Sequence, residues 1–154
     1  MTVVSQPARY RVWVPFGSLE VGVHRESPVV LLVDSHDDSA AMYAIGLLAL
    51  GFQPLTARTA DDGFARACEI RPDVIVADVI LDGASGVELT RRLRCDARTQ
   101  HTGIIVLTGQ ALGPMRRAAH EAGCDRILLK PCLPDALAVE IRDVLNRRQN
   151  HIDS

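Results

Sequence analysis

Lysine, aromatic side chains and long apolar runs are all scarce in this sequence of 154 residues. The longest apolar run covers residues 40–50, contains Gly46 and is too short to cross a bilayer. A basic-then-apolar leader that ends in a small-residue cleavage site is also missing. We therefore expect a soluble protein that resides in the cytoplasm and has no membrane partner.

The sequence has no excess of positive charge, because 17 basic residues face 19 acidic ones and the formal net charge is −2. A domain built mainly to bind nucleic acid is usually strongly basic, so we expect no nucleic-acid partner. No C-x-x-C pair occurs, and a chain of this length forms a core without disulfides. We expect the four cysteines to be buried thiols: Cys68, Cys95, Cys124 and Cys132.

Short apolar runs alternate with helical periods from residue 29 onward. Four runs are continuous, as in strands buried on both faces of a parallel sheet, and a weaker one that contains proline suits an edge strand. The runs are residues 29–33, 54–57, 74–77, 104–107 and 127–129. Five strands that alternate with five helices predict an α/β fold with a doubly wound parallel sheet.

Local signals mark the ends of these helices. Gly51 follows the apolar stripe of the first helix, where a glycine commonly ends a helix. Thr59 with Asp62, and Ser85 with Glu88, have the spacing of capping boxes at the starts of the second and third helices. The arginines in residues 91–94 are expected on a solvated helix face.

Residues 1–28 form an N-terminal extension outside this pattern. Residues 10–16 and 19–23 alternate in polarity around Gly17 and Ser18, which predicts a β-hairpin. Its aromatic side chains suit an interface, either for a homodimer or for another protein, and a disordered leader is an equal alternative. We expect the folded domain over residues 29–148 and a C-terminal tail over residues 149–154.

Polar residues follow four of the predicted strands. These residues are Asp34, Asp78, Thr108 and Lys130, which is the only lysine of the chain. In a parallel sheet the carboxyl ends of the strands share one edge, where ligands bind, so these side chains should meet in one cleft. Mg²⁺ would relieve the repulsion between two carboxylates, and an added ammonium and hydroxyl suit phosphoryl transfer to an aspartate nucleophile.

Residues 29 to about 147 resemble the CheY-like receiver domain of two-component response regulators. The resemblance is carried by VVLLVD (29–34), DVIVADVILDGASGVEL (73–89), IIVLTG (104–109) and GCDRILLKP (123–131). The spacings also match, with 30 residues from Asp78 to Thr108 and 22 more to Lys130. The resemblance implies a flavodoxin-like sheet of five strands in the order 2-1-3-4-5.

The resemblance also implies roles for individual residues. Asp78 would be the phosphoacceptor, and Mg²⁺ would be held by Asp34, Asp78 and the backbone carbonyl of Ile80. Thr108 would supply the hydroxyl that follows the phosphoryl group, and Lys130 would be the cation that pairs with it.

Two small features beside these residues follow from the same resemblance. Gly109 would leave room for the phosphoryl group, and the peptide bond before Pro131 would be cis.

Three positions depart from the family's pattern. Ser35 replaces a second acid that is generally a direct Mg²⁺ ligand, so we expect weaker metal binding, with the hydroxyl or a nearby Asp37 or Asp38 as a substitute ligand. Asp82 adds a negative charge beside the phosphoacceptor loop. Ile127 replaces the aromatic residue of the fifth strand, so the usual rearrangement of threonine and aromatic ring cannot occur in its ordinary form.

The sequence therefore predicts a stand-alone receiver that signals through protein contacts. It would accept a phosphoryl group on Asp78 from a histidine kinase or phosphotransfer protein and pass the signal to an unknown downstream protein. We expect a signalling module and not an enzyme, apart from phosphorylation and dephosphorylation of Asp78. The alternative is a degenerate receiver that binds proteins without phosphorylation, and the evidence for it is Ser35, Asp82 and Ile127.

Overall fold

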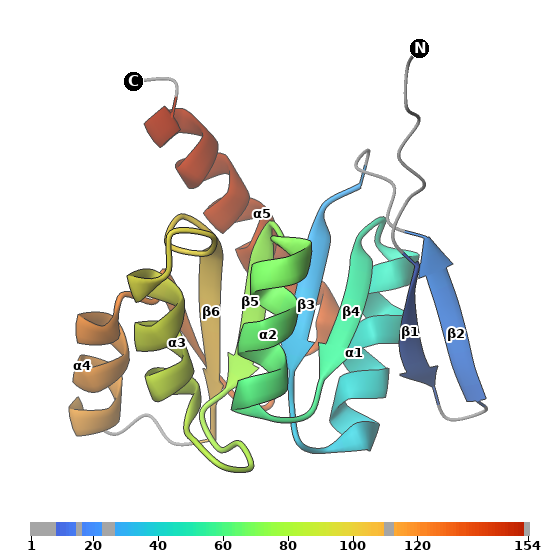
Figure 1. Ribbon diagram of the computed structural model, residues 1–154, viewed down its shortest axis with the longest axis horizontal. Helices are drawn as coiled ribbons and strands as arrows, with labels where there is room; N and C mark the ends of the chain where they lie inside the picture. The colour runs from blue at the N-terminus through green and yellow to red at the C-terminus, as the bar shows by residue number, and fades with distance from the viewer. Residues whose placement is uncertain (1–8, 15–16, 23–26, 110–112, 153–154) are drawn as a thin grey trace.

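A parallel sheet with helices on both faces forms most of the computed structural model (Figure 1). The structure describes residues 9–14, 17–22, 27–109 and 113–152. The strands are β1 (Arg9–Val14), β2 (Gly17–Gly22), β3 (Val29–Val33), β4 (Gln53–Ala57), β5 (Val74–Asp78), β6 (Gly103–Thr108) and β7 (Arg126–Leu129). The helices are α1 (Asp37–Ala49), α2 (Ala60–Ile70), α3 (Gly86–Cys95), α4 (Gly113–Ala122) and α5 (Pro134–Ile152).

The five-stranded sheet has the order β4-β3-β5-β6-β7, and every neighbouring pair is parallel. This confirms the predicted α/β fold and the order 2-1-3-4-5. Helices α1 and α5 contact each other on one face, and α2, α3 and α4 form a row on the other (Figure 1). All residues of β3, β5 and β6 are buried, because helices cover both faces of these central strands.

The helix ends have the local chemistry that the sequence predicts. The hydroxyl of Thr59 accepts a hydrogen bond from the backbone N–H of Asp62 at 3.0 Å, and that of Ser85 accepts one from Glu88 at 3.1 Å. Each bond satisfies a backbone donor that the first turn of a helix leaves without a partner. Gly51 follows α1 with a φ of +92°, a conformation that favours glycine.

Strands β1 and β2 pair antiparallel and form the predicted hairpin, but its turn is not where we expected it. Gly17 and Ser18 belong to β2, and the pairing of Val14 with Gly17 moves the connection to residues 15–16, which lie outside the described residues. Gly17 pairs with Val14 and Ser18 pairs with Trp13, so the strand ladder runs through the two residues that we expected at the turn. Strand β1 lies beside β4 and α1.

The core lies between the sheet and its two helical layers. Leu31, Ile75, Ile104, Leu137 and Ile141 have 0% exposure. Helix α5 continues to Ile152, past the boundary at residue 148 that we expected for the tail. Within the described ranges, none of the helices combines the length and the apolar character needed to cross a membrane.

Candidate functional site

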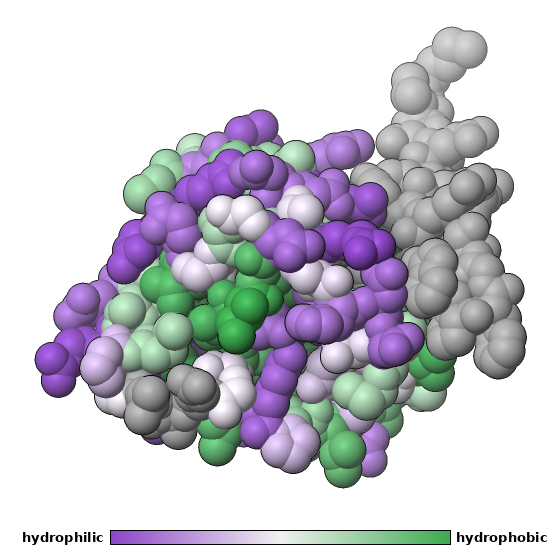
Figure 2. Space-filling model, turned by 90° about the horizontal axis from the view of Figure 1, so that it is seen from below, coloured by the Kyte–Doolittle hydropathy of each residue, from purple (hydrophilic) through white to green (hydrophobic). Residues whose placement is uncertain are grey.

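The four polar residues predicted at strand ends all lie at the carboxyl edge of the sheet. Asp34 follows β3, Asp78 ends β5, Thr108 ends β6 and Lys130 follows β7. Figure 2 shows the molecule from this edge, where apolar surface gathers in the middle and hydrophilic residues surround it. The aspartates and Thr108 are 5–6% exposed, so burial strengthens the electrostatic interactions among the groups of this cleft.

Asp78 is held by a charged and a backbone donor. The Nζ atom of Lys130 lies 2.5 Å from Oδ2 of Asp78, and the backbone N–H of Ile80 donates to Oδ1 at 3.2 Å. The backbone N–H of Lys130 donates to the carbonyl of Thr108 at 2.7 Å, which fixes the lysine beside the end of β6. The Lys130–Pro131 peptide bond is cis, as the resemblance implied.

Asp34 is the second carboxylate of the cleft. Its Oδ1 accepts a hydrogen bond from the backbone N–H of His36 at 2.8 Å, and Nδ1 of the His36 ring lies 3.4 Å from the same oxygen. Asp34, His36 and Asp78 each offer a ligand atom, and these atoms lie within 4.8 Å of one another. Two adjacent buried carboxylates fit a divalent cation, because oxygen ligands of this kind suit Mg²⁺.

Ser35 connects two loops at the rim of the cleft. Its hydroxyl donates to the carbonyl of Arg58 at 2.8 Å and accepts a hydrogen bond from the backbone N–H of Asp82 at 2.9 Å. The side chain of Asp37 forms an ion pair with Arg58 at 3.0 Å instead of joining the carboxylate group. The third potential metal ligand grouped with Asp34 and Asp78 is His36.

Two glycines give the cleft its shape. A Cβ atom on Gly86 would lie 2.3 Å from the backbone oxygen of Asp78, so only glycine lets α3 begin this close to the end of β5. A Cβ atom on Gly109 would meet nothing within 4 Å, which agrees with an open space beside Thr108.

Strand β7 itself carries no aromatic residue. Ile127 is partly buried and packs against the core. The phenol of Tyr43 on α1 instead reaches the β7 side of the cleft, where it donates a hydrogen bond to the carbonyl of Cys132 at 2.8 Å. Burial raises the pKa of Tyr43, and the negative charges of nearby groups such as Asp34 and Asp78 act in the same direction. The phenol therefore remains a neutral donor.

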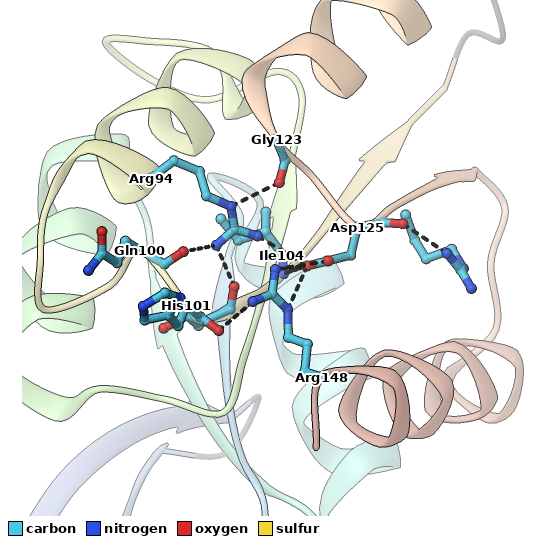
Figure 3. Close-up of polar contacts among 9 residues, drawn as sticks. Arg94, Gln100, His101, Ile104, Gly123, Asp125 and Arg148 are labelled. Carbon is cyan, nitrogen blue, oxygen red and sulfur yellow. Dashed lines mark hydrogen bonds and ion pairs between the residues drawn. The ribbon is translucent and has the colours of Figure 1, made fainter. Parts of the chain in front are cut away.

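A second polar cluster lies at the opposite edge of the sheet (Figure 3). The carboxylate of Asp125 accepts hydrogen bonds from Arg94 at 3.1 Å, from Arg148 at 2.9 Å and from the backbone N–H of Ile104 at 2.8 Å. The prediction of a solvated face is wrong for Arg94, whose side chain is only 18% exposed because it reaches into this cluster. The cluster joins α3, β6 and α5.

The cysteines divide by environment. Cys68 and Cys124 are buried as predicted, whereas Cys95 at the end of α3 is exposed and Cys132 is intermediate. Burial raises the pKa of Cys124 to about 11, which keeps its thiol neutral and unreactive near pH 7. Cys95 differs from the prediction because the last turn of α3 ends at the surface.

Comparisons with known proteins agree with this geometry. The family model described as the response regulator receiver domain matches residues 30–142. The chain is 33% identical over 118 residues to the phosphate regulon transcriptional regulatory protein PhoB of Pseudomonas aeruginosa, a match that covers 77% of this chain and 52% of the relative. It is 34% identical over 130 residues to the transcriptional regulatory protein PrrA of Mycobacterium leprae, covering 84% of this chain and 54% of that protein.

Solved structures show the same architecture. The chemotaxis response regulator CheY4 of Vibrio cholerae is 26% identical, with a TM-score of 0.73 over 77% of this chain and 98% of that one. The receiver domain of a sensor histidine kinase from Pseudomonas aeruginosa, whose structure has a magnesium ion coordinated in the active-site cleft, is 24% identical. Its TM-score is 0.73 over 78% of this chain and 98% of that one, which shows the shared fold.

The chain spans about half the length of the curated relatives that it matches. The family model nevertheless covers most of the sequence, from β3 into α5. This protein therefore belongs to the response regulator receiver domain family of two-component signalling.

Proposed function

We propose that this receiver accepts a phosphoryl group on Asp78 from a histidine kinase or phosphotransfer protein. The observation that carries the proposal is the contact of 2.5 Å between Lys130 Nζ and Asp78 Oδ2 in a cleft that also holds Asp34. An aspartate of this kind is a nucleophile, and a fixed ammonium beside it suits the charge of a transferred phosphoryl group. Lys130 is the only lysine of the chain, so no neighbouring lysine can replace it.

In the proposed step, a carboxylate oxygen of Asp78 attacks the phosphorus of a phosphohistidine. The new P–O bond forms as the P–N bond breaks, and the electron pair of that bond stays on the departing imidazole. Lys130 then pairs with the phosphoryl oxygens, and the hydroxyl of Thr108 donates to one of them. Mg²⁺, held by Asp34, Asp78 and the carbonyl of Ile80, would neutralise part of the negative charge on the phosphoryl group.

The added charge is the signal. A phosphoryl group on Asp78 changes the charge of the cleft and the position of the groups around it, which alters the surface that a partner meets. Exposed apolar side chains lie beside the cleft, since Ile80 is 75% exposed and Leu129 is 52% exposed. Apolar surface next to a charged site suits contact with a protein. We also propose that the receiver acts without an attached output domain. The mass of the protein expressed in its native cell tests this.

One observation favours the alternative of a phosphorylation-independent binding module. The hydroxyl of Ser35 is hydrogen-bonded to the backbone of Arg58 and of Asp82. The residue next to Asp34 therefore supplies no negative charge for a cation, and its hydroxyl already has two partners. Ile127 also lacks the ring that would report phosphorylation to the β7 face. In this alternative the same surface would bind its partner constitutively.

Intact-mass spectrometry after incubation with acetyl phosphate distinguishes the two functions. We expect the unmodified chain to gain the mass of one phosphoryl group when Mg²⁺ is present, and Asp78→Asn to gain none. Asp61→Asn is the matched control, because Asp61 lies on α2 with a side-chain exposure of 90% and is not one of the cleft residues, so it should not change the adduct. An adduct that persists in Asp78→Asn would overturn the assignment of the phosphoacceptor. No adduct with any divalent cation would favour the binding module.

A further inference from the structure

The donor atoms of the cleft differ from an all-oxygen magnesium site. Within the part of the chain that the structure describes, the group that could hold a metal combines the carboxylates of Asp34 and Asp78 with the imidazole of His36. The two carboxylates are buried, and the imidazole lies at the rim with a side-chain exposure of 69%. A cation in the cleft would therefore have two carboxylates and an imidazole available as ligands.

The hydroxyl of Ser35 makes two hydrogen bonds to backbone groups of other loops. Its proton is donated to the carbonyl of Arg58, and its oxygen accepts the N–H of Asp82. These bonds connect the segment after β4 with the loop after β5, where Thr59 and Asp82 form a bridge. Coordination of a metal by Ser35 would compete with this connection, so the next residue is the better ligand.

The backbone positions His36 for that role. Its N–H donates to Asp34 Oδ1 at 2.8 Å, which folds the chain back over the carboxylate and brings the ring nitrogen to 3.4 Å from the same oxygen. His36 is also the N-cap residue of α1, but its side chain makes no capping hydrogen bond. The ring is therefore available for coordination without loss of a bond that stabilises the helix.

We propose that His36 is a ligand of the cation in this cleft and that the site prefers a first-row transition metal to Mg²⁺. Imidazole suits metals such as Co²⁺, Ni²⁺ and Zn²⁺, whereas Mg²⁺ is a hard cation that takes oxygen ligands. This inference rests on the proposed function in one respect, namely that the cation binds in the cleft beside Asp78. Metal binding needs no phosphoryl group, so its test is independent of phosphorylation.

Titration calorimetry with Co²⁺ and with Mg²⁺ tests the proposal on the full chain. We expect Co²⁺ to bind at least about tenfold more tightly than Mg²⁺, and His36→Ala to remove most of that preference while the Mg²⁺ affinity changes little. His101→Ala is the matched control, because His101 is an exposed histidine before β6, at the opposite edge of the sheet. The visible absorption of bound Co²⁺ should change in His36→Ala and not in His101→Ala.

Two further variants locate the ion and test the reason for the preference. Asp78→Asn should weaken both metals, because it removes a carboxylate that both require. Ser35→Asp should raise the affinity for Mg²⁺ relative to Co²⁺, because it supplies a third carboxylate. Equal Co²⁺ affinity and an unchanged spectrum in His36→Ala would overturn the proposal, as would Co²⁺ binding that is lost only when the exposed Cys95 is replaced. Failure of the acetyl phosphate reaction would leave these titrations unaffected.

Discussion

Replacement of Asp125 by alanine should destabilise the protein more than the same replacement of an exposed acid that also pairs with two arginines. The carboxylate of Asp125 accepts from the guanidinium groups of Arg94 and Arg148 and from the backbone N–H of Ile104, at distances of 2.8–3.1 Å (Figure 3). These donors come from α3, α5 and β6. One carboxylate therefore holds three elements that are far apart in the sequence.

The magnitude follows from what each donor loses. Ile104 has 0% exposure, and a buried N–H without an acceptor costs about 1–3 kcal/mol. The arginines keep carbonyl partners, since Arg94 also donates to Gly123 and Thr102 and Arg148 to His101. Their side chains are 18% and 27% exposed, so solvent screens the lost charge only in part. We expect a total loss of about 3 kcal/mol, at the lower end for a broken buried ion pair.

Urea denaturation followed by far-ultraviolet circular dichroism measures this loss. With a slope of about 2 kcal/mol per molar urea, Asp125→Ala should lower the midpoint by about 1.5 M. Asp143→Ala is the matched control, because Asp143 also pairs with two arginines but on the exposed face of α5, where its side chain is 42% exposed. Its midpoint should move far less, because solvent screens an exposed pair.

Equal shifts for Asp125→Ala and Asp143→Ala would refute this reasoning, because burial would then not set the cost. Asp125→Asn refines the result, since its amide oxygen can still accept the N–H of Ile104 while the negative charge is lost. We expect an intermediate shift for it. The phosphoryl adduct at 25 °C should form normally in folded Asp125→Ala, because the cluster lies at the edge of the sheet opposite the cleft.

Three further outcomes are expected. Gly86→Ala should reduce the phosphoryl adduct and the thermal midpoint of unfolding, because the new Cβ would lie 2.3 Å from the backbone oxygen of Asp78. Gly109→Ala should leave the thermal midpoint unchanged, because its Cβ would meet nothing within 4 Å. Burial raises the pKa of Cys124 from 9.0 to about 11, so the unfolded thiol ionises first. The free energy of unfolding should then fall as pH rises from 9 to 11, by up to about 3 kcal/mol, and urea midpoints should show a shallower fall in Cys124→Ala. Tyr43→Phe should cost about 1 kcal/mol in the same urea assay, because it removes a hydrogen bond to the loop after β7.

The sheet was predictable because strands that are buried on both faces consist of continuous runs of apolar residues. The runs at residues 29–33, 74–77 and 104–107 became β3, β5 and β6 with shifts of a residue or less at their ends. Helix starts were predictable for a different reason, since Thr59 and Ser85 act within three residues of their own position. Both signals are local, and neither depends on how distant elements pack.

Topology extended this local information to the cleft. Once the strands are parallel and in order, their carboxyl ends share an edge, and Asp34, Asp78 and Lys130 come together although they are far apart in the chain. The roles of these residues in phosphoryl transfer stay predictions. His36 was not predicted as a ligand because a histidine in a loop is usually solvated. A signal was present, since an aspartate two residues earlier can bind the backbone N–H and turn the chain.

Contacts between distant loops could not be predicted from the sequence. The two bonds of Ser35 depend on the positions of Arg58 and Asp82, which only the folded chain defines. The partners of Asp125 likewise come from separate elements, so Arg94 of α3 had the appearance of an ordinary solvated residue. Side-chain networks of this kind follow from packing and leave no periodic pattern.

The charge of the cleft connects Ser35 with the metal that the site should hold. A third carboxylate beside Asp34 and Asp78 would leave an excess of two negative charges over the ammonium of Lys130, whereas serine leaves an excess of one. The attraction for any divalent cation is therefore weaker, and the preference among cations depends more on the chemistry of the remaining ligand. Because the ligand that His36 would supply is an imidazole nitrogen, that chemistry favours a first-row transition metal. The serine that is expected to weaken Mg²⁺ binding should thus raise the influence of His36 on which cation the cleft binds.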